Sequence, residues 1–358
     1  MLKLDRLLGE SGIMDVFSEG ETVAVKTHMG HKLCTRYLRP HFIRIIVDKI
    51  REAGGMPFVT DTTGLGLSLR PTSSHRYNAK DYLSMVVEHG FTPETVNAPI
   101  IIADGLWGDD DIEVSFNGLK VKKIYVAKAI AQADSVLSVA HFKGHELTGF
   151  GGALKNIGVG CTSKAGKFAL HGTRKPSINL EKCDGCGVCL EYCFAEAITI
   201  KNGKAFIDPD KCTGCLHCNG QCPRDAVEVG WEESDAFQVK MVDAVAAVMK
   251  VVGKENIGYV NFALDITPIC DCAPSSDVPI VPDIGVFASK DPVAIDKASV
   301  DSVNDSVGVP DSSAEESGAL ERGSDKFQLI HKVNWKKQFD TAEKLGLGSS
   351  NYDLIKVT

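Results

Sequence analysis

Eight of the twelve cysteines lie between positions 183 and 222, in two copies of one spacing. Each copy has the pattern Cys-x2-Cys-x2-Cys-x3-Cys, and equivalent cysteines are 29 residues apart. The two sets are Cys183, Cys186, Cys189 and Cys193, and Cys212, Cys215, Cys218 and Cys222. Phe194 follows the first set where Pro223 follows the second. Such a repeat indicates a duplicated unit of a loop, a helical turn and a short strand.

This spacing predicts two [4Fe–4S] clusters, because a tight loop supplies three thiolates to one side of a cubane and the fourth comes from the other repeat. We expect one cluster on Cys183, Cys186, Cys189 and Cys222, and the other on Cys212, Cys215, Cys218 and Cys193. Tandem four-thiolate zinc sites are the alternative, but they pair Cys-x2-Cys units across longer spacers. The pattern therefore indicates an electron-transfer module of the bacterial ferredoxin type at residues 176–230.

The composition of the chain limits the kinds of partner that it can bind. The chain is 44% hydrophobic and 24% charged, as globular proteins are, and its net charge of −8 argues against a nucleic-acid partner. Neither a signal peptide nor an apolar run of about 18–20 residues is evident, so we expect a cytoplasmic protein without a membrane span. Cysteines in a reducing compartment favour metal or redox roles over disulfides. The expected partners are a redox protein and a small anionic substrate.

The remaining sequence alternates short apolar strands with amphipathic helices. Strands are predicted at residues 22–26, 57–60, 99–103, 135–139, 257–264 and 283–287, helices at 40–50 and 238–252, and a hairpin at 111–126. This alternation favours an α/β fold with a mostly parallel sheet and flanking helices. Because the cysteine repeat interrupts it, we predict one discontinuous α/β domain, residues 1–175 and 231–358, with an α+β ferredoxin-like domain inserted at 176–230.

A glycine-rich segment follows the predicted strand at 135–139 and contains four candidate catalytic residues, His141, Lys143, His145 and Lys155. In open α/β sheets, ligands bind at the carboxyl ends of the strands. The histidines could bind a metal or move protons, and the lysines could hold a carboxylate or phosphate. The alternative is that the glycines serve packing and the lysines are solvated.

A second cysteine motif, Cys270-Asp-Cys272, offers two thiols that could chelate a soft metal. Cys161 or a histidine would have to complete such a third metal centre; otherwise the cysteines are small buried residues. Weaker candidates lie at other strand ends and loops: His28, His31, Asp61 and His75.

Several of these motifs together resemble the domain-of-unknown-function 362 family of iron–sulfur proteins. They are Val23–His28, Glu52–Asp61, His141–Asn156, Cys270–Cys272 and Asp291–Asp296. The resemblance implies the α/β fold and a ferredoxin pair inserted at the same place, and it implies an anaerobic setting, but it supplies no substrate. The spacing of His145 and Lys155 is also similar to that in nickel-pincer lactate racemases, an analogy at the level of fold.

Three functions are compatible with these features. The favoured one is an oxidoreductase whose clusters pass electrons to a ligand in the His/Lys cleft. The second is a non-enzymatic ferredoxin-like carrier or scaffold for redox enzymes. The third is a metal-site or maturation protein that uses Cys161, Cys270 and Cys272. No G-x-G-x-x-G follows a predicted strand, so no nicotinamide or flavin site is expected.

Overall fold

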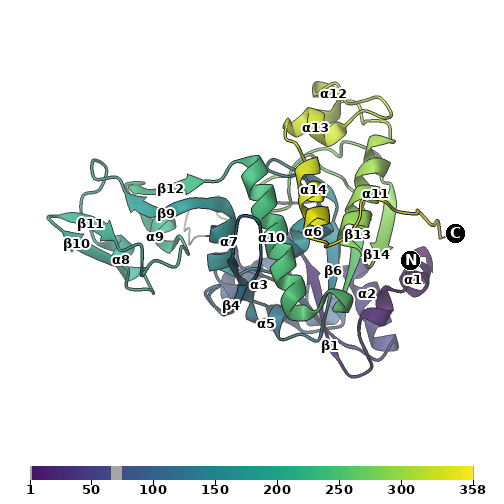
Figure 1. The fold of residues 1–358 in the computed structure, drawn as a ribbon, viewed down its shortest axis with the longest axis horizontal. Helices are drawn as coiled ribbons and strands as arrows, with labels where there is room; N and C mark the ends of the chain where they lie inside the picture. The colour runs from purple at the N-terminus through teal and green to yellow at the C-terminus, as the bar shows by residue number, and fades with distance from the viewer. Residues whose placement is uncertain (1, 66–74, 358) are drawn as a thin grey trace.

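The computed structural model describes residues 2–65 and 75–357, and its centre is a six-stranded sheet (Figure 1). The strand order is β14-β13-β6-β1-β2-β3, and only β14 runs antiparallel to its neighbour. The strands are β1 Thr22–Thr27, β2 Met56–Asp61, β3 Ile100–Ile102, β6 Ser135–His141, β13 Ile257–Ala263 and β14 Gly285–Ser289. The predicted α/β fold with a mostly parallel sheet and flanking helices is confirmed.

The two faces of the sheet pack against different sets of helices. Every residue of β6 and β13 is buried, as is typical of parallel strands covered on both sides. Successive residues of β6 enter opposite cores, with Val136 in one and Leu137 in the other. The first core includes helices α6 Ala153–Gly158, α10 Ser234–Val252, α11 Pro292–Asn304 and α14 Lys336–Lys344; the second includes α1 Leu2–Glu10, α2 Pro40–Glu52 and α3 Ala79–Glu88.

Local sequence explains the helix boundaries. Pro40 begins α2, and its apolar residues recur at helical spacing on the buried face. The chain leaves the helix through Gly54, whose φ of 87° lies in the left-handed region. Asn78 caps α3 by accepting a hydrogen bond from the Asp81 N–H.

The order of the strands places a topological switch point at β1. The chain adds β2 and β3 on one side of β1 and β6 and β13 on the other. The carboxyl ends of β1 and β6 therefore border the crevice in which α/β sheets bind their ligands.

Residues 172–231 form a lobe that extends away from the sheet, beyond α7 Lys164–His171 (Figure 1). It contains two antiparallel pairs, β9 Gly172–Ile178 with β12 Val227–Trp231, and β10 Ile198–Lys201 with β11 Lys204–Ile207. Short helices α8 Val188–Glu191 and α9 His217–Gln221 occupy equivalent positions in the two repeats. Positive φ angles also recur 29 residues apart, at Gly185 and Gly214 and at Glu196 and Asp225.

The remaining elements are short. The predicted hairpin is confirmed as β4 Asp111–Ser115 paired with β5 Lys123–Ala127. The others are η1 Ile13–Val16, α4 Pro93–Val96, α5 Lys128–Ala131, β7 Lys143–His145, β8 Gly149–Gly151, η2 Lys254–Asn256, α12 Ser313–Glu316 and α13 Lys326–His331. Within the described residues, no helix has the length and apolar character that crossing a membrane requires.

Asp296, on α11, provides a test of how that helix holds α6. Its buried carboxylate accepts hydrogen bonds from the N–H groups of Ala153 and Leu154, at 2.7 and 2.9 Å, and from Asn261 at 2.7 Å. Asp296→Ala leaves these donors unsatisfied, so we expect a loss of about 3 kcal/mol in the free energy of unfolding, measured by anaerobic urea denaturation. The matched control is Asp305→Ala, at the exposed C-terminal end of α11. Its free energy of unfolding should stay within about 0.5 kcal/mol of the wild type. Equal losses in the two variants would contradict this role.

Candidate functional site

Asp61, the last residue of β2, lies at the centre of a buried ion network beside the switch point. Its Oδ1 is 2.9 Å from Lys26 Nζ, and its Oδ2 accepts hydrogen bonds from His28 Nδ1, at 2.8 Å, and from the Tyr82 hydroxyl. Arg76 lies 4.0 Å from the same oxygen. Burial opposes ionisation, but Lys26 and His28 hold the pKa of Asp61 well below its usual value.

His28 is a neutral ring within this network. Its Nδ1 donates to Asp61, while its Nε2 faces Arg76 at 3.3 Å. Because a guanidinium can only donate, Nε2 is the acceptor. Burial, reinforced by the charge of Arg76, lowers the pKa of His28.

A second network surrounds Asp271, the residue between the two cysteines of the Cys270–Cys272 motif. His141 Nδ1 is 3.0 Å from both carboxylate oxygens, and Lys143 Nζ is 3.4 Å from one of them. The other ring nitrogen of His141 donates to the carbonyl of Leu264 at 2.8 Å. Both nitrogens of His141 are thus used to hold the loop after β13.

His145, Cys270 and Cys272 form a third group, whose candidate ligand atoms all lie within 4.8 Å of one another. His145 and Cys270 are buried, whereas Cys272 is exposed. Lys155, on α6, places Nζ 3.4 Å from the Cys270 sulfur. A hydrogen bond from the Cys272 thiol, together with Lys155, holds the pKa of Cys270 well below its usual value, even though burial opposes this. Burial and Lys155 in turn lower the pKa of His145.

Glycine at position 144 brings this group together. The Gly144 N–H donates to the Thr267 carbonyl at 2.8 Å, and a Cβ at this position would lie 2.0 Å from the carbonyl oxygen of Pro268. Only glycine lets β7 lie this close to the loop after β13. The close approach sets His145 beside cysteines that are more than a hundred positions away in the sequence.

The structure thus gives the four candidate catalytic residues two different settings. His145 and Lys155 adjoin the cysteine pair, whereas His141 and Lys143 support Asp271. Cys161 does not belong to the group of His145, Cys270 and Cys272. It is fully buried, and its sulfur lies 3.9 Å from the Asn156 carbonyl. Among the weaker candidates, His28 and Asp61 share one ion pair, while His31 is buried and its Nδ1 accepts from the Leu33 N–H. His75 is partly buried at a positive φ of 52°.

Sequence reasoning did not identify Lys26, Arg76, Tyr82 or Asp271. Lys26 carried a usable signal, since a lysine that directly follows the apolar run Val23–Val25 in the same strand must find a counter-charge when the strand is buried. Asp271 stood between two singled-out cysteines. No pattern in the sequence marked Arg76 or Tyr82.

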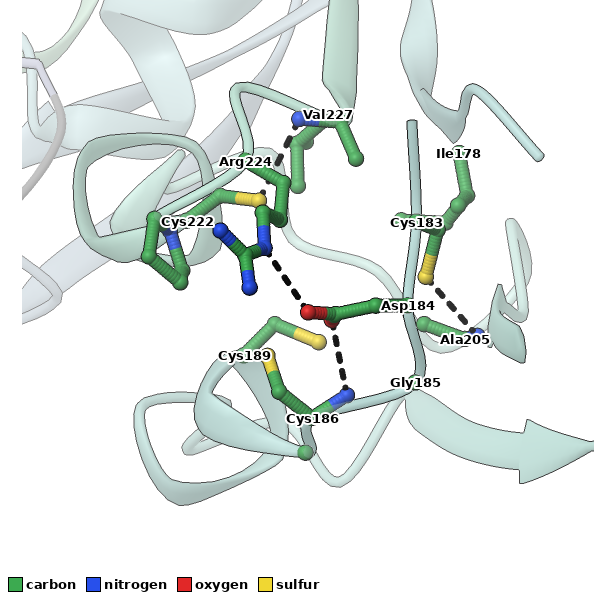
Figure 2. A pocket seen from close by; sticks show the side chains of 13 residues that line it. Ile178, Cys183, Asp184, Gly185, Cys186, Cys189, Ala205, Cys222, Arg224 and Val227 are labelled. Atoms are coloured by element: carbon green, nitrogen blue, oxygen red, sulfur yellow. Dashed lines mark hydrogen bonds and ion pairs between the residues drawn. The ribbon is translucent and has the colours of Figure 1, made fainter. Parts of the chain in front are cut away.

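The eight repeat cysteines line two separate cavities in the lobe. One is lined by Cys183, Cys186, Cys189 and Cys222, whose side chains surround the same space in Figure 2. The other is lined by Cys193, Cys212, Cys215 and Cys218. Each cavity therefore takes three cysteines from one repeat and one from the other.

Backbone N–H groups point at the cysteine sulfurs. Ala226 N–H donates to Cys222 Sγ at 3.2 Å, and its equivalent, Ala197 N–H, donates to Cys193 Sγ at 3.3 Å. Such bonds stabilise thiolate charge, and they occupy equivalent places in the two repeats.

The lobe packs on the body through the side that holds the second cavity. His217 of α9 is 2.7 Å from Lys164 Nζ of α7, and the rings of Trp107 and Phe194 pack at a tilt of 38° with a centroid distance of 5.3 Å. A Cβ on Gly214 would lie 2.2 Å from the ring of Phe168. Phe194, which replaces the proline of the second repeat, therefore forms part of the contact with the body.

The fold and the site together define an α/β protein with two buried charge networks at the carboxyl edge of its sheet and two cysteine-lined cavities in a lobe. The chain belongs to the family described as a domain of unknown function (DUF362), which matches residues 23–301. No curated protein matches it.

Among solved structures, the chain is similar to the lactate racemase apoprotein from Thermoanaerobacterium thermosaccharolyticum, with 14% identity and a TM-score of 0.40 over 80% of this chain and 51% of that one. A protein from Thermotoga maritima, a structural genomics target, matches with 10% identity and a TM-score of 0.30 over 72% of this chain and 48% of that one. The chain thus spans about half the length of these proteins.

Asp61→Asn tests the charge balance of the cleft. The substitution leaves Lys26 buried without its counter-charge, so we expect a loss of about 3–5 kcal/mol in the free energy of unfolding, measured by denaturant titration. Because the pKa of Asp61 is depressed, its contribution is complete above about pH 4 and is lost as the pH falls further. The loss should therefore be equal at pH 7 and pH 5.

The control for this test is Asp265→Asn, which breaks the more exposed pairs with Arg36 and Arg39 and should cost about 1 kcal/mol or less. A loss in Asp61→Asn no greater than in this control would contradict the assigned role.

Proposed function

We propose that this protein is an iron–sulfur oxidoreductase that holds two [4Fe–4S] clusters in a ferredoxin-type module, residues 176–230 of the lobe, and passes electrons through them to a ligand beside Asp61 and Lys155. The observation that carries the proposal is the division of the eight cysteines between two cavities. Each cavity has three cysteines from one repeat and one from the other, which is the ligand set that a duplicated cluster-binding loop requires.

The spacing of the sulfurs favours a multi-iron core over a single ion. Four thiolates bound to one zinc at about 2.3 Å would lie about 3.8 Å apart. Among the described residues, the atoms of His145, Cys270 and Cys272 lie within 4.8 Å of one another, whereas no three of the eight lobe cysteines bring their sulfurs that close. The sulfurs around each cavity are therefore more widely spaced than a single zinc ion requires.

The cavities also offer what a reduced cluster needs. Bound clusters would supply one-electron chemistry, with potentials tuned by hydrogen bonds to sulfur. The N–H groups of Ala197 and Ala226 already aim at cysteine sulfurs, and Ala205 N–H is 3.5 Å from Cys183 Sγ.

The packing of the lobe gives the electron route a direction. The cavity lined by Cys212 and Cys215 is nearer the body, since Lys164 contacts His217 of α9 at 2.7 Å and Gly214 abuts Phe168. The other cavity includes Cys186, which is exposed. A redox partner protein would therefore reduce the outer cluster, and the inner one would face the body.

Helix α7 links the inner cavity to the cleft. Lys164, near its start, contacts His217 of the lobe, and burial lowers the pKa of this lysine to about 8. One turn later, Lys167 donates to the Thr62 hydroxyl at 2.6 Å. The Thr62 N–H in turn donates to Asp61 at 2.9 Å. A short series of buried polar contacts thus joins the lobe to the ion network of the cleft.

The cleft residues fit an anionic ligand. Four cations lie in this region: Lys26, Arg76, Lys143 and Lys155. They outnumber the two carboxylates of Asp61 and Asp271, so the region has an excess of positive charge. Lys155 is the ammonium nearest the cysteine pair and could donate a proton to a bound ligand. Such a small anion is the proposed electron acceptor or donor.

Metal content tests the clusters. Protein purified without oxygen should contain about eight iron and eight sulfide per chain. Cys186→Ser and Cys215→Ser should each reduce both counts towards four, because each removes a ligand from a different cluster. Cys34→Ser is the control, since Cys34 lies outside both cavities, and it should keep the full count. Zinc in the cavities without sulfide would contradict the proposal.

The oxidoreductase and the non-enzymatic carrier differ in whether the protein binds a small molecule besides its clusters. We expect native mass spectrometry of the anaerobic protein to show a retained mass beyond the two clusters, and Lys155→Ala to lose it because the ligand's counter-charge is gone. No retained mass, combined with redox enzymes that co-purify, would favour the carrier.

A further inference from the structure

We propose that His145, Cys270 and Cys272 bind a single thiophilic divalent metal ion and leave its fourth coordination position open to an anionic ligand from the cleft. The metal site stands on its own geometry, whereas its place at the end of the electron route rests on the proposed function. Its third ligand is a histidine, which the sequence had left open as the alternative to Cys161.

The positions of the ligand atoms suit such an ion. All three lie within 4.8 Å of one another, and bonds of about 2.3 Å to sulfur and 2.0–2.1 Å to nitrogen would draw them to about 3.5–3.8 Å. That closure needs only small side-chain rotations. Two thiolates and one imidazole are the donor set that zinc and related borderline metals prefer.

The cysteine pair is held ready by the residue between them. Asp271 is fixed by His141 and Lys143, with contacts of 3.0 and 3.4 Å, and is buried. Residues 270–273 form a turn closed by a hydrogen bond from the Ala273 N–H to the Cys270 carbonyl at 2.9 Å, and the anchored Asp271 holds this turn, with both cysteines, in place. Cys272 N–H also donates to Cys270 Sγ at 3.4 Å, which stabilises the thiolate that a metal needs.

His145 is oriented by a hydrogen-bonded chain behind it. His145 Nδ1 accepts a hydrogen bond from the Leu147 N–H at 3.2 Å. The Thr148 hydroxyl lies 3.0 Å from the same nitrogen and 2.7 Å from the Phe150 carbonyl. These contacts occupy Nδ1 and orient the ring, so Nε2 is the nitrogen left for a metal, whose binding releases a proton.

The charges around the site explain the open position. A divalent ion with two thiolates and a neutral imidazole carries no net charge, and Lys143 is paired with Asp271, but the Lys155 ammonium lies 3.4 Å from the Cys270 sulfur. The positive charge of Lys155 favours an anion as the fourth ligand. Three protein ligands with one free position are typical of catalytic rather than structural metal sites.

Zinc titration of the anaerobic protein with both clusters intact tests the site. We expect one zinc per chain and a zinc K-edge spectrum with two sulfur neighbours at about 2.3 Å and one nitrogen at about 2.0–2.1 Å. Cys272→Ser and His145→Ala should each weaken zinc binding at least about 100-fold, because each removes a direct ligand. Thr148→Val, which removes the group that orients His145, should weaken it by about 10–100-fold.

Cys34→Ser is the matched control, because Cys34 is a buried cysteine outside the three-residue group, and it should bind zinc like the wild type. Iron and sulfide must be counted in every variant, so that failure of the clusters is told apart from failure of this site. Zinc binding that survives both Cys272→Ser and His145→Ala would overturn the proposal. So would a chain that binds no zinc after reduction, or whose mass shows a Cys270–Cys272 disulfide that zinc cannot displace.

Discussion

Charge compensation by buried carboxylates is the constraint on which the cleft depends. Lys26 is 1% exposed in the middle of a parallel sheet, and it can be there only because Asp61 accepts its charge from the neighbouring strand. Asp61 also holds His28 and Tyr82, so one carboxylate joins β1, β2 and α3. Asp271 has the equivalent role across the switch point, where it joins β6 to the loop after β13.

These two networks leave the chemically reactive groups between them. His145, Cys270 and Lys155 are not needed to neutralise either carboxylate, so they remain available to a metal or a ligand. On the other side of Asp61, contacts through Thr62 and Lys167 lead along α7 to the lobe. The cleft and the cysteine cavities are therefore parts of one connected polar interior.

Much of this arrangement followed from the sequence. Regular strand and helix patterns predicted the α/β fold, because burial on both faces forces continuous apolar strands such as Ser135–Val139. The cysteine spacing predicted a three-plus-one division, and the two cavities in the lobe have that composition. Residues placed at strand ends, such as Asp61, His141 and His145, fell at the expected edge of the sheet.

The rest depended on contacts between distant segments, which periodicity does not encode. His145 meets Cys270 because Gly144 lies against Pro268, and nothing in either local pattern announces that pairing. Arg76 reaches the cleft from a loop without a recognisable motif. Cys161 appeared suitable as a third ligand by residue type alone, but the packing of α6 buries it elsewhere.

The central claim, that the lobe carries two iron–sulfur clusters, is tested most directly by anomalous diffraction at the iron edge from crystals grown without oxygen. The account predicts iron in both cavities, four atoms enclosed by Cys183, Cys186, Cys189 and Cys222 and four by Cys193, Cys212, Cys215 and Cys218. Cavities without an iron signal, or a single zinc atom in each, would contradict it.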